Sequence, residues 1–160
     1  MSSNICVINA SPLILLGKLG RTDLLESLAD QVWVPEAVYR EVAAGTDEAG
    51  AAASLAWAQC RQVPDVAVPT SILGWDLGTG ESQVLAHCLM GRHLAVLDDG
   101  EARAAARVHA LPLVGTLGVI LRARAAGLIP AARPLIEQLL ESGSYLSNEL
   151  VRVALAKVGE

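Results

Sequence analysis

Phenylalanine is absent from this chain of 160 residues, and aromatic residues of any kind make up only 3% of it. Leucine, valine, isoleucine and alanine must therefore fill the core, and we expect Trp33, Trp57 and Trp75 to be its largest members. Charged residues are also few, at 18%, whereas hydrophobic residues reach 52%. A chain of this length and composition can bury enough apolar surface for one folded domain, which excludes an intrinsically disordered protein.

Long apolar runs are missing as well. No segment approaches the ~18 consecutive apolar residues that a membrane-spanning helix requires, so we expect no membrane association. The first residues lack the basic opening of a signal peptide, and Asn4 and Asn9 interrupt them. The cysteines are odd in number and widely spaced, at Cys6, Cys60 and Cys88. This indicates buried, reduced thiols in a cytoplasmic protein, and it excludes a zinc site of the usual spacing.

Lysine is nearly absent, because arginine supplies ten of the twelve cationic side chains, and the net charge is −5. These values exclude a protein that holds nucleic acid by bulk electrostatic attraction. They leave room for a few basic groups around an acidic, metal-loaded cleft. Arg103 and Arg107 are candidates, since they lie one helical turn apart just after Asp98 and Asp99.

Short unbroken apolar runs alternate with helical patterns, which predicts a parallel sheet with helices on both faces. The predicted strands cover residues 5–9, 31–34, 93–97 and 113–115, and residues 63–68 form at most an edge strand because of their flanking prolines. The predicted helices begin at Ser11-Pro12 and then cover residues 22–28, 35–44, 47–60, 81–90, 98–110, 116–126, 131–141 and 147–158.

Polar side chains stand where these strands give way to helices. In open parallel sheets, sites form outside the carboxyl ends of the strands, and Asn9 and Asp98 both follow such ends. If their strands are neighbours, the two side chains meet. Carboxylates gathered in this way usually bind a cation, and a carboxylate-bound divalent ion is a common basis for phosphodiester cleavage.

Each candidate residue also has a purely structural interpretation. Asp98 or Asp99 could cap the following helix, and Glu81 could simply favour the dipole of its helix from the first turn. Glu41 lies beside Val38 and Val42 on the apolar face of its helix, which favours a site over a surface role, with an ion pair to a buried arginine as the alternative.

Three more polar residues belong to the candidate site, whereas the histidines and the paired glycines do not. An amide oxygen such as that of Asn9 can bind a hard cation without adding charge, although it could equally satisfy backbone groups at a turn. Ser11 and Thr116 are predicted helix caps whose hydroxyls would also face the strand ends, within reach of a metal through water. The histidines show no ligand spacing, and the glycines at 78 and 80 lack the pattern of a phosphate-binding loop.

Taken together, five blocks of the sequence resemble the PIN domain, a family of small metal-dependent ribonucleases that includes the VapC-like toxins of toxin–antitoxin pairs. The resemblance is closest to an uncharacterised prokaryotic branch of that superfamily. The blocks are residues 9–14 (NASPLI), 34–38 (VPEAV) with Glu41, 77–81 (LGTGE), 97–99 (LDD) with Ala102-Arg103, and 115–118 (GTLG).

The resemblance implies a three-layer α/β/α domain over residues 1–160, with a parallel sheet of four to five strands in the order 3-2-1-4-5. The core would cover about residues 1–128, and residues 129–160 would form a helical extension. It also implies a Mg²⁺ or Mn²⁺ site. Glu41, Glu81 and Asp98 match acids of the family, Asp99 lies close by, and Asn9 stands where most PIN domains have an aspartate.

Our first hypothesis is a cytoplasmic, metal-dependent endoribonuclease, the toxin of a toxin–antitoxin pair. Asn9, Glu41, Glu81 and Asp98 would be the metal ligands, and Glu41, Glu81, Asp98 and Asp99 the catalytic residues. Arg103 and Arg107 would contact RNA, and Ser11 and Thr116 would support the site. The resemblance implies an antitoxin partner, and leucine-rich surfaces at 24, 25, 28, 135 and 139 predict a homodimer.

Two alternatives remain at this level. Asn9 removes one negative charge from the metal cradle, which is compatible with a PIN-like module that binds RNA or protein without cutting it. A small-molecule phosphatase of doubly wound fold is a third class, but it requires an aspartate pair after the first strand, and Asn9-Ala10-Ser11 does not provide one.

Overall fold

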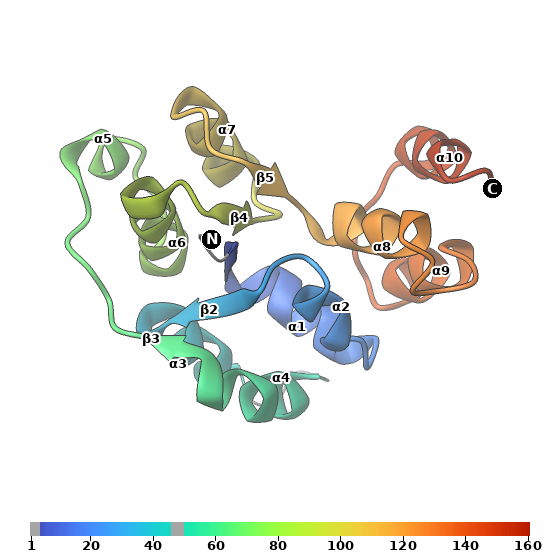
Figure 1. Ribbon diagram of the computed structural model, residues 1–160, viewed down its shortest axis with the longest axis horizontal. Coiled ribbons are helices and arrows are strands. Elements are labelled where there is room, and N and C mark those ends of the chain that lie inside the picture. The colour runs from blue at the N-terminus through green and yellow to red at the C-terminus, as the bar shows by residue number, and fades with distance from the viewer. Residues whose placement is uncertain (1–3, 46–49) are drawn as a thin grey trace.

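The computed structural model describes residues 4–45 and 50–160, and Figure 1 shows the arrangement of their helices and strands. Five parallel strands form one sheet in the order β3-β2-β1-β4-β5, which confirms the predicted sheet. The strands are β1 (Ile5–Ile8), β2 (Gln31–Pro35), β3 (Gln62–Val63), β4 (Leu94–Val96) and β5 (Leu113–Val114).

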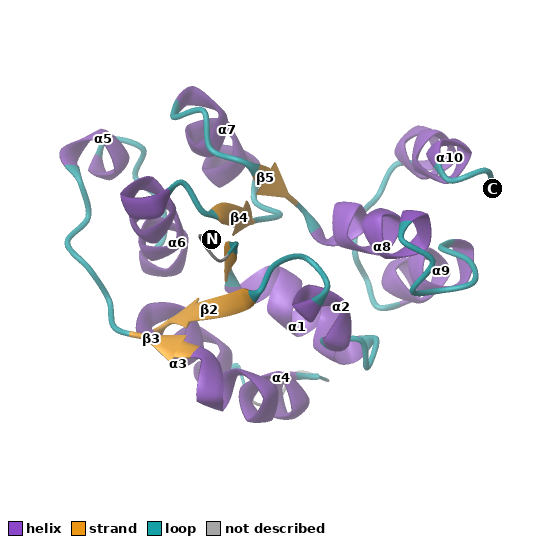
Figure 2. Cartoon of the chain, in the orientation of Figure 1, coloured by secondary structure: helices purple, strands orange, loops and turns teal. Residues whose placement is uncertain are grey.

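Helices account for most of the remaining chain (Figure 2). They are α1 (Ala10–Lys18), α2 (Asp23–Glu26), α3 (Glu36–Ala44), α4 (Ala51–Ala58), a 3₁₀ turn at Gln59–Arg61, α5 (Thr70–Leu73), α6 (Thr79–Gly91), α7 (Gly100–Val108), α8 (Thr116–Ala125), α9 (Arg133–Glu141) and α10 (Asn148–Lys157). The predicted start of the fourth helix, near residue 47, lies outside the described residues.

Two local predictions were wrong. The edge strand predicted for residues 63–68 is only Gln62–Val63, because Pro64 begins an extended segment that cannot continue the ladder of hydrogen bonds. The short helix α5 was not predicted. Its four residues follow Pro69 and bury only Ile72, so they carry too little apolar periodicity to be recognised.

Helices cover both faces of the sheet, as expected for a parallel sheet. The central helix α6 contacts β1, β2 and β4, and α7 contacts β5. On the other side of the central strands, α1 and α2 both contact α8 (Figure 1). The sheet is therefore buried between two helical layers, which confirms the three-layer architecture.

Aliphatic side chains fill most of the core, together with two buried cysteines. Its largest fully buried members are leucines, isoleucines and valines such as Ile8 and Leu85, whereas all three tryptophans are only partly buried. The expectation that tryptophans are the large core pieces was wrong. Their indole N–H groups need partners, and two find them near the surface, from Trp33 to Gln31 (3.1 Å) and from Trp57 to Glu26 (2.9 Å).

The cysteines divide into two kinds. Cys6 and Cys88 are buried, and burial raises the pKa of the Cys6 thiol to about 12 and that of the Cys88 thiol still further. Cys60 is exposed, so the expectation of three buried thiols was wrong for this residue. The two buried thiols are inert because thiolate formation is suppressed.

The strand register brings two polar positions to one edge of the sheet. Ile8 of β1 pairs with Val96 of β4, and the backbone N–H of Asn9 donates to the carbonyl oxygen of Val96 at 3.1 Å. Asn9 and Asp98 therefore leave neighbouring strands at the same carboxyl edge, as predicted from their places in the sequence.

The last three helices pack beside α1 and α2 at one end of the molecule (Figure 1). Leu24, Leu25, Leu135 and Leu139 are buried within this single chain, and Leu28 is half-buried. The argument that these leucines require a second copy was therefore wrong. Among the described residues, no helix has the length and apolar character to cross a bilayer.

Glu160 holds this end of the molecule together. Its carboxylate accepts hydrogen bonds from the backbone N–H groups of Ala132 (2.7 Å) and Arg133 (3.0 Å), at the start of α9, and from the Arg124 guanidinium (3.3 Å). The backbone hydrogen bonds, with Arg124 in support, lower the pKa of Glu160.

We expect Glu160→Gln to lower the midpoint of thermal unfolding at neutral pH. Because the pKa of Glu160 is depressed in the folded state, its contribution is present above the unfolded value, about 4.3, and is lost as the pH falls through the folded pKa. The difference between native and variant should therefore shrink as the pH falls below about 4. The control is Glu149→Gln, whose exposed pair with Arg152 should contribute little.

Candidate metal and nuclease site

Three polar side chains lie near the start of α6, where Glu41 and Asn9 approach Gly80 and Glu81 approaches Gly78. A β-carbon built on Gly80 would lie 2.6 Å from Glu41 Oε2 and 3.2 Å from Asn9 Oδ1. The side-chain amide of Asn9 donates to Glu81 Oε1 at 3.4 Å. Glycine at position 80 thus makes room for oxygens that any larger residue would displace.

Asn9 is the most unusual of the three. Asn9 is only 3% exposed, and its Oδ1 atom is buried without a hydrogen-bond partner. A buried polar oxygen without a partner costs roughly 1–3 kcal/mol. A partnerless oxygen between α3 and α6, each of which carries a glutamate, is typical of a site that binds a cation or a polar ligand.

Glu41 lies differently from the prediction. The glutamate is exposed, so its assignment to the apolar face of α3 was wrong. Its carboxyl end nevertheless turns back toward Gly80 from the rim of that face, next to Val38. Partial burial, and then the negative charge of Glu81, raise the pKa of Glu41. The site therefore holds two carboxylates that repel one another when both are ionised.

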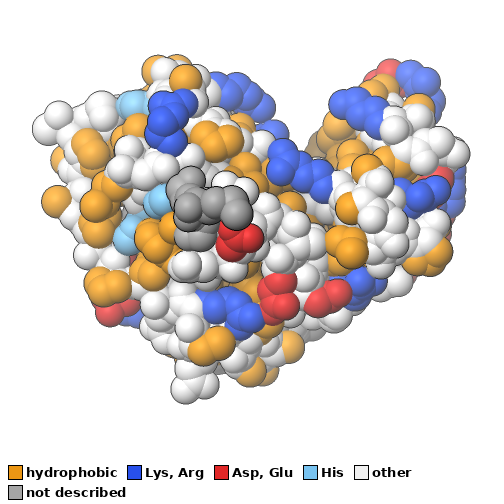
Figure 3. Space-filling view, viewed as in Figure 1, with side chains coloured by type: hydrophobic (Ala, Val, Ile, Leu, Met, Phe, Trp, Pro, Cys, Tyr) orange, Lys and Arg blue, Asp and Glu red, His pale blue; other side chains and the backbone are white. Residues whose placement is uncertain are grey.

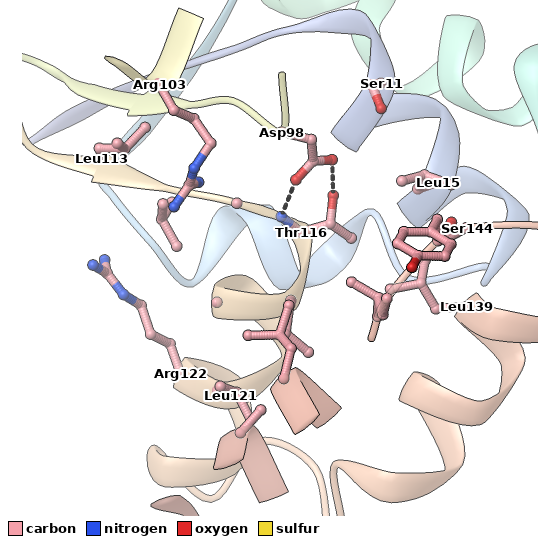
Figure 4. Close-up of a pocket in the computed structure, with 18 of the residues that line it drawn as sticks. Ser11, Leu15, Asp98, Arg103, Leu113, Thr116, Leu121, Arg122, Leu139 and Ser144 are labelled. Carbon is pink, nitrogen blue, oxygen red and sulfur yellow. Dashed lines mark hydrogen bonds between the residues drawn. The ribbon is translucent and has the colours of Figure 1, made fainter. Parts of the chain in front are cut away.

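Asp98 occupies the next position along the sheet edge. Both of its oxygens accept hydrogen bonds from Thr116, one from the backbone N–H at 2.8 Å and one from the hydroxyl at 2.5 Å (Figure 4). Within residues 4–45 and 50–160, no three Asp, Glu, His or Cys side chains gather closely enough to form a metal site of those residue types. The close cluster is thus Asn9, Glu41 and Glu81, and Asp98 does not join it but bonds Thr116 instead.

Asp99 has a structural task. Its carboxylate accepts the backbone N–H of Ala102 at 2.9 Å, which makes Asp99 the N-cap of α7. Ser11 and Thr116 were expected to be caps, but both lie inside the first turns of their helices, after Asn9 and Gly115. Thr116 uses its hydroxyl on Asp98 instead.

A groove of about 790 Å³ opens beside Asp98. One wall comes from the sheet edge and α8, and the other from the segment between α9 and α10 and from α10 itself (Figure 4). In the space-filling view, the α8–α10 end is separated from the rest of the molecule by a notch with basic side chains on both sides (Figure 3). The groove thus lies between the sheet edge and the closing helices.

Cations dominate the charge of this groove. Arg103, Arg122 and Lys157 line it, and Asp98 is its one acidic residue among the described parts of the chain. This balance is the reverse of the whole chain, whose net charge is −5. Arg103 was predicted to contact RNA, and it does line the groove. Its guanidinium also donates to the carbonyl oxygen of Leu97 at 2.9 Å. Arg107, the other predicted RNA contact, is exposed on α7 and is not among the residues that line the groove.

Sequence reasoning missed two of these cations. Arg122 lies on α8 six positions after Thr116, and Lys157 ends α10. The sequence already placed Arg122 on the helix that begins at Thr116, so Arg122 could have been predicted as a groove residue. Lys157 carries no such signal, because only the packing of the closing helices brings it back to the groove.

The donor set at Gly80 fits a hard divalent cation. Carboxylate and amide oxygens are the ligands that Mg²⁺ and Mn²⁺ prefer, and Asn9, Glu41 and Glu81 contribute only such oxygens. The partnerless Asn9 Oδ1 and the space that Gly80 leaves open are what a bound ion would use. A cation would also relieve the repulsion between the two glutamates.

A parallel α/β/α sheet in the order 3-2-1-4-5, with acids near its carboxyl edge, is the architecture of a PIN-like fold. The model of the DUF3368 family, described as a PIN domain, matches residues 5–160, so the chain belongs to this PIN-domain family. The match includes the closing helices. Searches of curated proteins and of solved structures found no significant match.

Proposed function

We propose that this PIN-domain protein is a metal-dependent endoribonuclease. The observation that carries the proposal is the approach of Glu41 and Glu81 to Asn9 at the start of α6, with the buried Asn9 oxygen left without a partner. The basic groove next to Asp98 supports it, because a phosphodiester substrate is an anion.

Each residue of the candidate site would have its own role in metal binding or in positioning. Asn9, Glu41 and Glu81 would hold Mg²⁺ or Mn²⁺, and Asp98, fixed by Thr116, would add a carboxylate on the groove side. When bound, such an ion lowers the pKa of a water molecule and stabilises charge on the phosphate. Asp99 would act indirectly, by capping the helix that carries Arg103.

The groove would receive the RNA backbone. Arg103, Arg122 and Lys157 are spread over its two walls and would contact phosphates, which position a nucleic acid without reading its sequence. Ser11 lines the same groove from the first turn of α1 and would contact the substrate through its hydroxyl.

The biological role that we propose is that of a cytoplasmic toxin in a prokaryotic toxin–antitoxin pair. It rests on the resemblance to VapC-like proteins and carries with it an antitoxin partner. A homodimer remains a prediction too, and its surface would have to be one other than the buried leucines. Exposed apolar side chains outside the groove, among them Leu128 and Leu140, are the candidates.

A second candidate is a PIN-domain module that binds RNA or protein without cutting it. Asn9 favours this reading, because its neutral amide leaves the cradle with one charge fewer than an aspartate would, and a cation is held less tightly as ligand charge decreases. Both candidates would use the groove, and the first differs from the second in that it hydrolyses the bound RNA.

The experiment that tests the first proposal is cleavage of single-stranded RNA by the purified protein. We expect cleavage in Mn²⁺ or Mg²⁺ and its loss in excess chelator, with recovery when the metal is restored. Cleavage that persists in chelator would exclude the metal mechanism. RNA binding without cleavage in either metal would favour the binding module.

A further inference from the structure

An extended strap, residues 64–69, runs from β3 to α5 (Figure 1), and hydrogen bonds join it to α3 and α6, the two helices that carry the site glutamates. It has no partner strand at these residues, so its polar backbone groups must be satisfied in another way. Side chains of α6 satisfy the backbone groups of Pro64 and Val66, and the Asp65 side chain of the strap in turn bonds α3.

On α6, Gln83 and His87 bind the strap from one face of the helix. Gln83 accepts the N–H of Val66 at 2.9 Å and donates to the carbonyl oxygen of the same residue at 2.8 Å. The His87 Nε2–H donates to the carbonyl oxygen of Pro64 at 3.0 Å. Both side chains are buried, at 6% and 5% exposure, so these hydrogen bonds are shielded from water.

On α3, Asp65 caps the helix from outside it. One carboxylate oxygen accepts the N–H of Ala37 in the first turn at 2.9 Å, and the other accepts from Arg40 at 2.8 Å. The residue next to Arg40 is Glu41, and the residue two positions before Gln83 is Glu81. The strap therefore ties α3 and α6 together close to the point where their two glutamates meet.

This position matters because both carboxylates lie against the side chain of Asn9: Glu41 shares the space beside Gly80 with the Asn9 oxygen, and Glu81 accepts from the Asn9 amide. Two like charges held this close repel one another. We propose that Asp65 and Gln83 are positioning residues, which hold α3 and α6 at the separation that the metal cradle requires. The inference rests on the proposed function for the metal, but the restraint itself can be measured without any metal.

The metal-free test is a double-mutant cycle on thermal unfolding in chelator at neutral pH. In the native chain, Glu81→Gln should raise the unfolding midpoint, because it relieves repulsion that the strap maintains. In the Asp65→Ala background the helices can separate, so the same change should raise the midpoint by less than half as much. Equal increases in both backgrounds would overturn the proposal, whether or not the chain binds metal or cleaves RNA.

The second test is Mn²⁺ affinity, measured by calorimetry. Asp65→Ala and Gln83→Leu should each weaken binding roughly tenfold, as expected for residues that orient metal ligands. Asp65→Asn keeps an oxygen for the Ala37 N–H and should restore near-native affinity. Ser147→Ala is the matched control, because it removes the N-cap of the distant α10 and should leave affinity unchanged.

The outcomes separate two failures. If the native chain binds no Mn²⁺, the proposed metal function fails, and the cycle in chelator alone decides whether the strap restrains the glutamates. If Mn²⁺ binds and Asp65→Ala weakens it no more than Ser147→Ala does, the strap has only an ordinary structural role and the proposal is wrong.

Discussion

Replacing Glu81 with glutamine is expected to reduce RNA cleavage by roughly a hundredfold or more while making the metal-free protein more stable. The loss of activity follows because the change replaces an anionic ligand oxygen with a neutral amide oxygen. A direct ligand matters at least as much as the outer partners of metal ligands, whose removal costs about 10–100-fold. The gain in stability follows because Glu81 contributes to the raised pKa of Glu41, which is a sign of repulsion between them.

The matched control for this change is Glu101→Gln. Glu101 is also a first-turn glutamate, in α7, and it is exposed. Both variants lose the same favourable interaction with a helix dipole, so a difference between them reports the site alone. Initial rates of RNA cleavage in Mn²⁺ and unfolding midpoints in chelator measure the two effects. A Glu81→Gln variant that cleaves RNA at the native rate would remove Glu81 from the site.

The second large effect is expected from Asn9→Asp. An aspartate here adds a third negative charge beside Glu41 and Glu81, and we expect Mn²⁺ affinity to rise about tenfold, since ligand charge tunes affinity for such ions. Without metal the same carboxylate is buried next to like charges, and we expect the variant to lose roughly 1–3 kcal/mol of stability. Calorimetric titration with Mn²⁺ and denaturant unfolding in chelator measure these two quantities.

Asn9→Asp also decides between the two candidate functions. If the native chain cleaves RNA, the variant should cleave it at a lower metal concentration. If the native chain shows no cleavage and the variant acquires it, the native protein is a binding module whose site lacks only one charge. Asn9→Ala is the control, because it removes the amide oxygen without adding charge, and it should weaken Mn²⁺ binding. Tighter binding by Asn9→Ala would contradict the assignment of Asn9 as a ligand.

Much of the fold could be predicted because its strands are short unbroken apolar runs separated by helical patterns. The parallel class follows from that alternation alone. The order of the strands came from the resemblance of motif blocks to the PIN domain, since pairings between distant segments leave no local trace. The tryptophans were misplaced because hydrophobicity ranks them as core residues, whereas each indole N–H also needs a polar partner.

The residues of the site could be predicted from the sequence, but which of them contact one another could be predicted less well. Asn9 and Glu81 stand at element boundaries that the sequence marks clearly, and a hydrogen bond between their side chains joins them in the structure. The division of labour between Asp98 and Asp99 could not be predicted, because either one could have capped α7. The role of Thr116 in holding Asp98 depends on the pairing of β4 with β5, which only the folded chain shows.

The strap contacts were beyond sequence reasoning for a similar reason. Gln83 and His87 lie four residues apart and so share a face of α6, but nothing in their spacing reveals that the face is covered by residues 64–66. Asp65 likewise caps a helix that begins nearly thirty residues before it, so no local capping pattern exists.

The most direct test of the account is a crystal of the protein soaked in Mn²⁺ and measured for anomalous scattering. We predict one strong peak within ligand distance of Asn9 Oδ1 and of the carboxylates of Glu41 and Glu81, in the space that Gly80 leaves open. A fully loaded crystal with no peak there, or with manganese bound only elsewhere on the surface, would contradict the claim that these oxygens form a metal site.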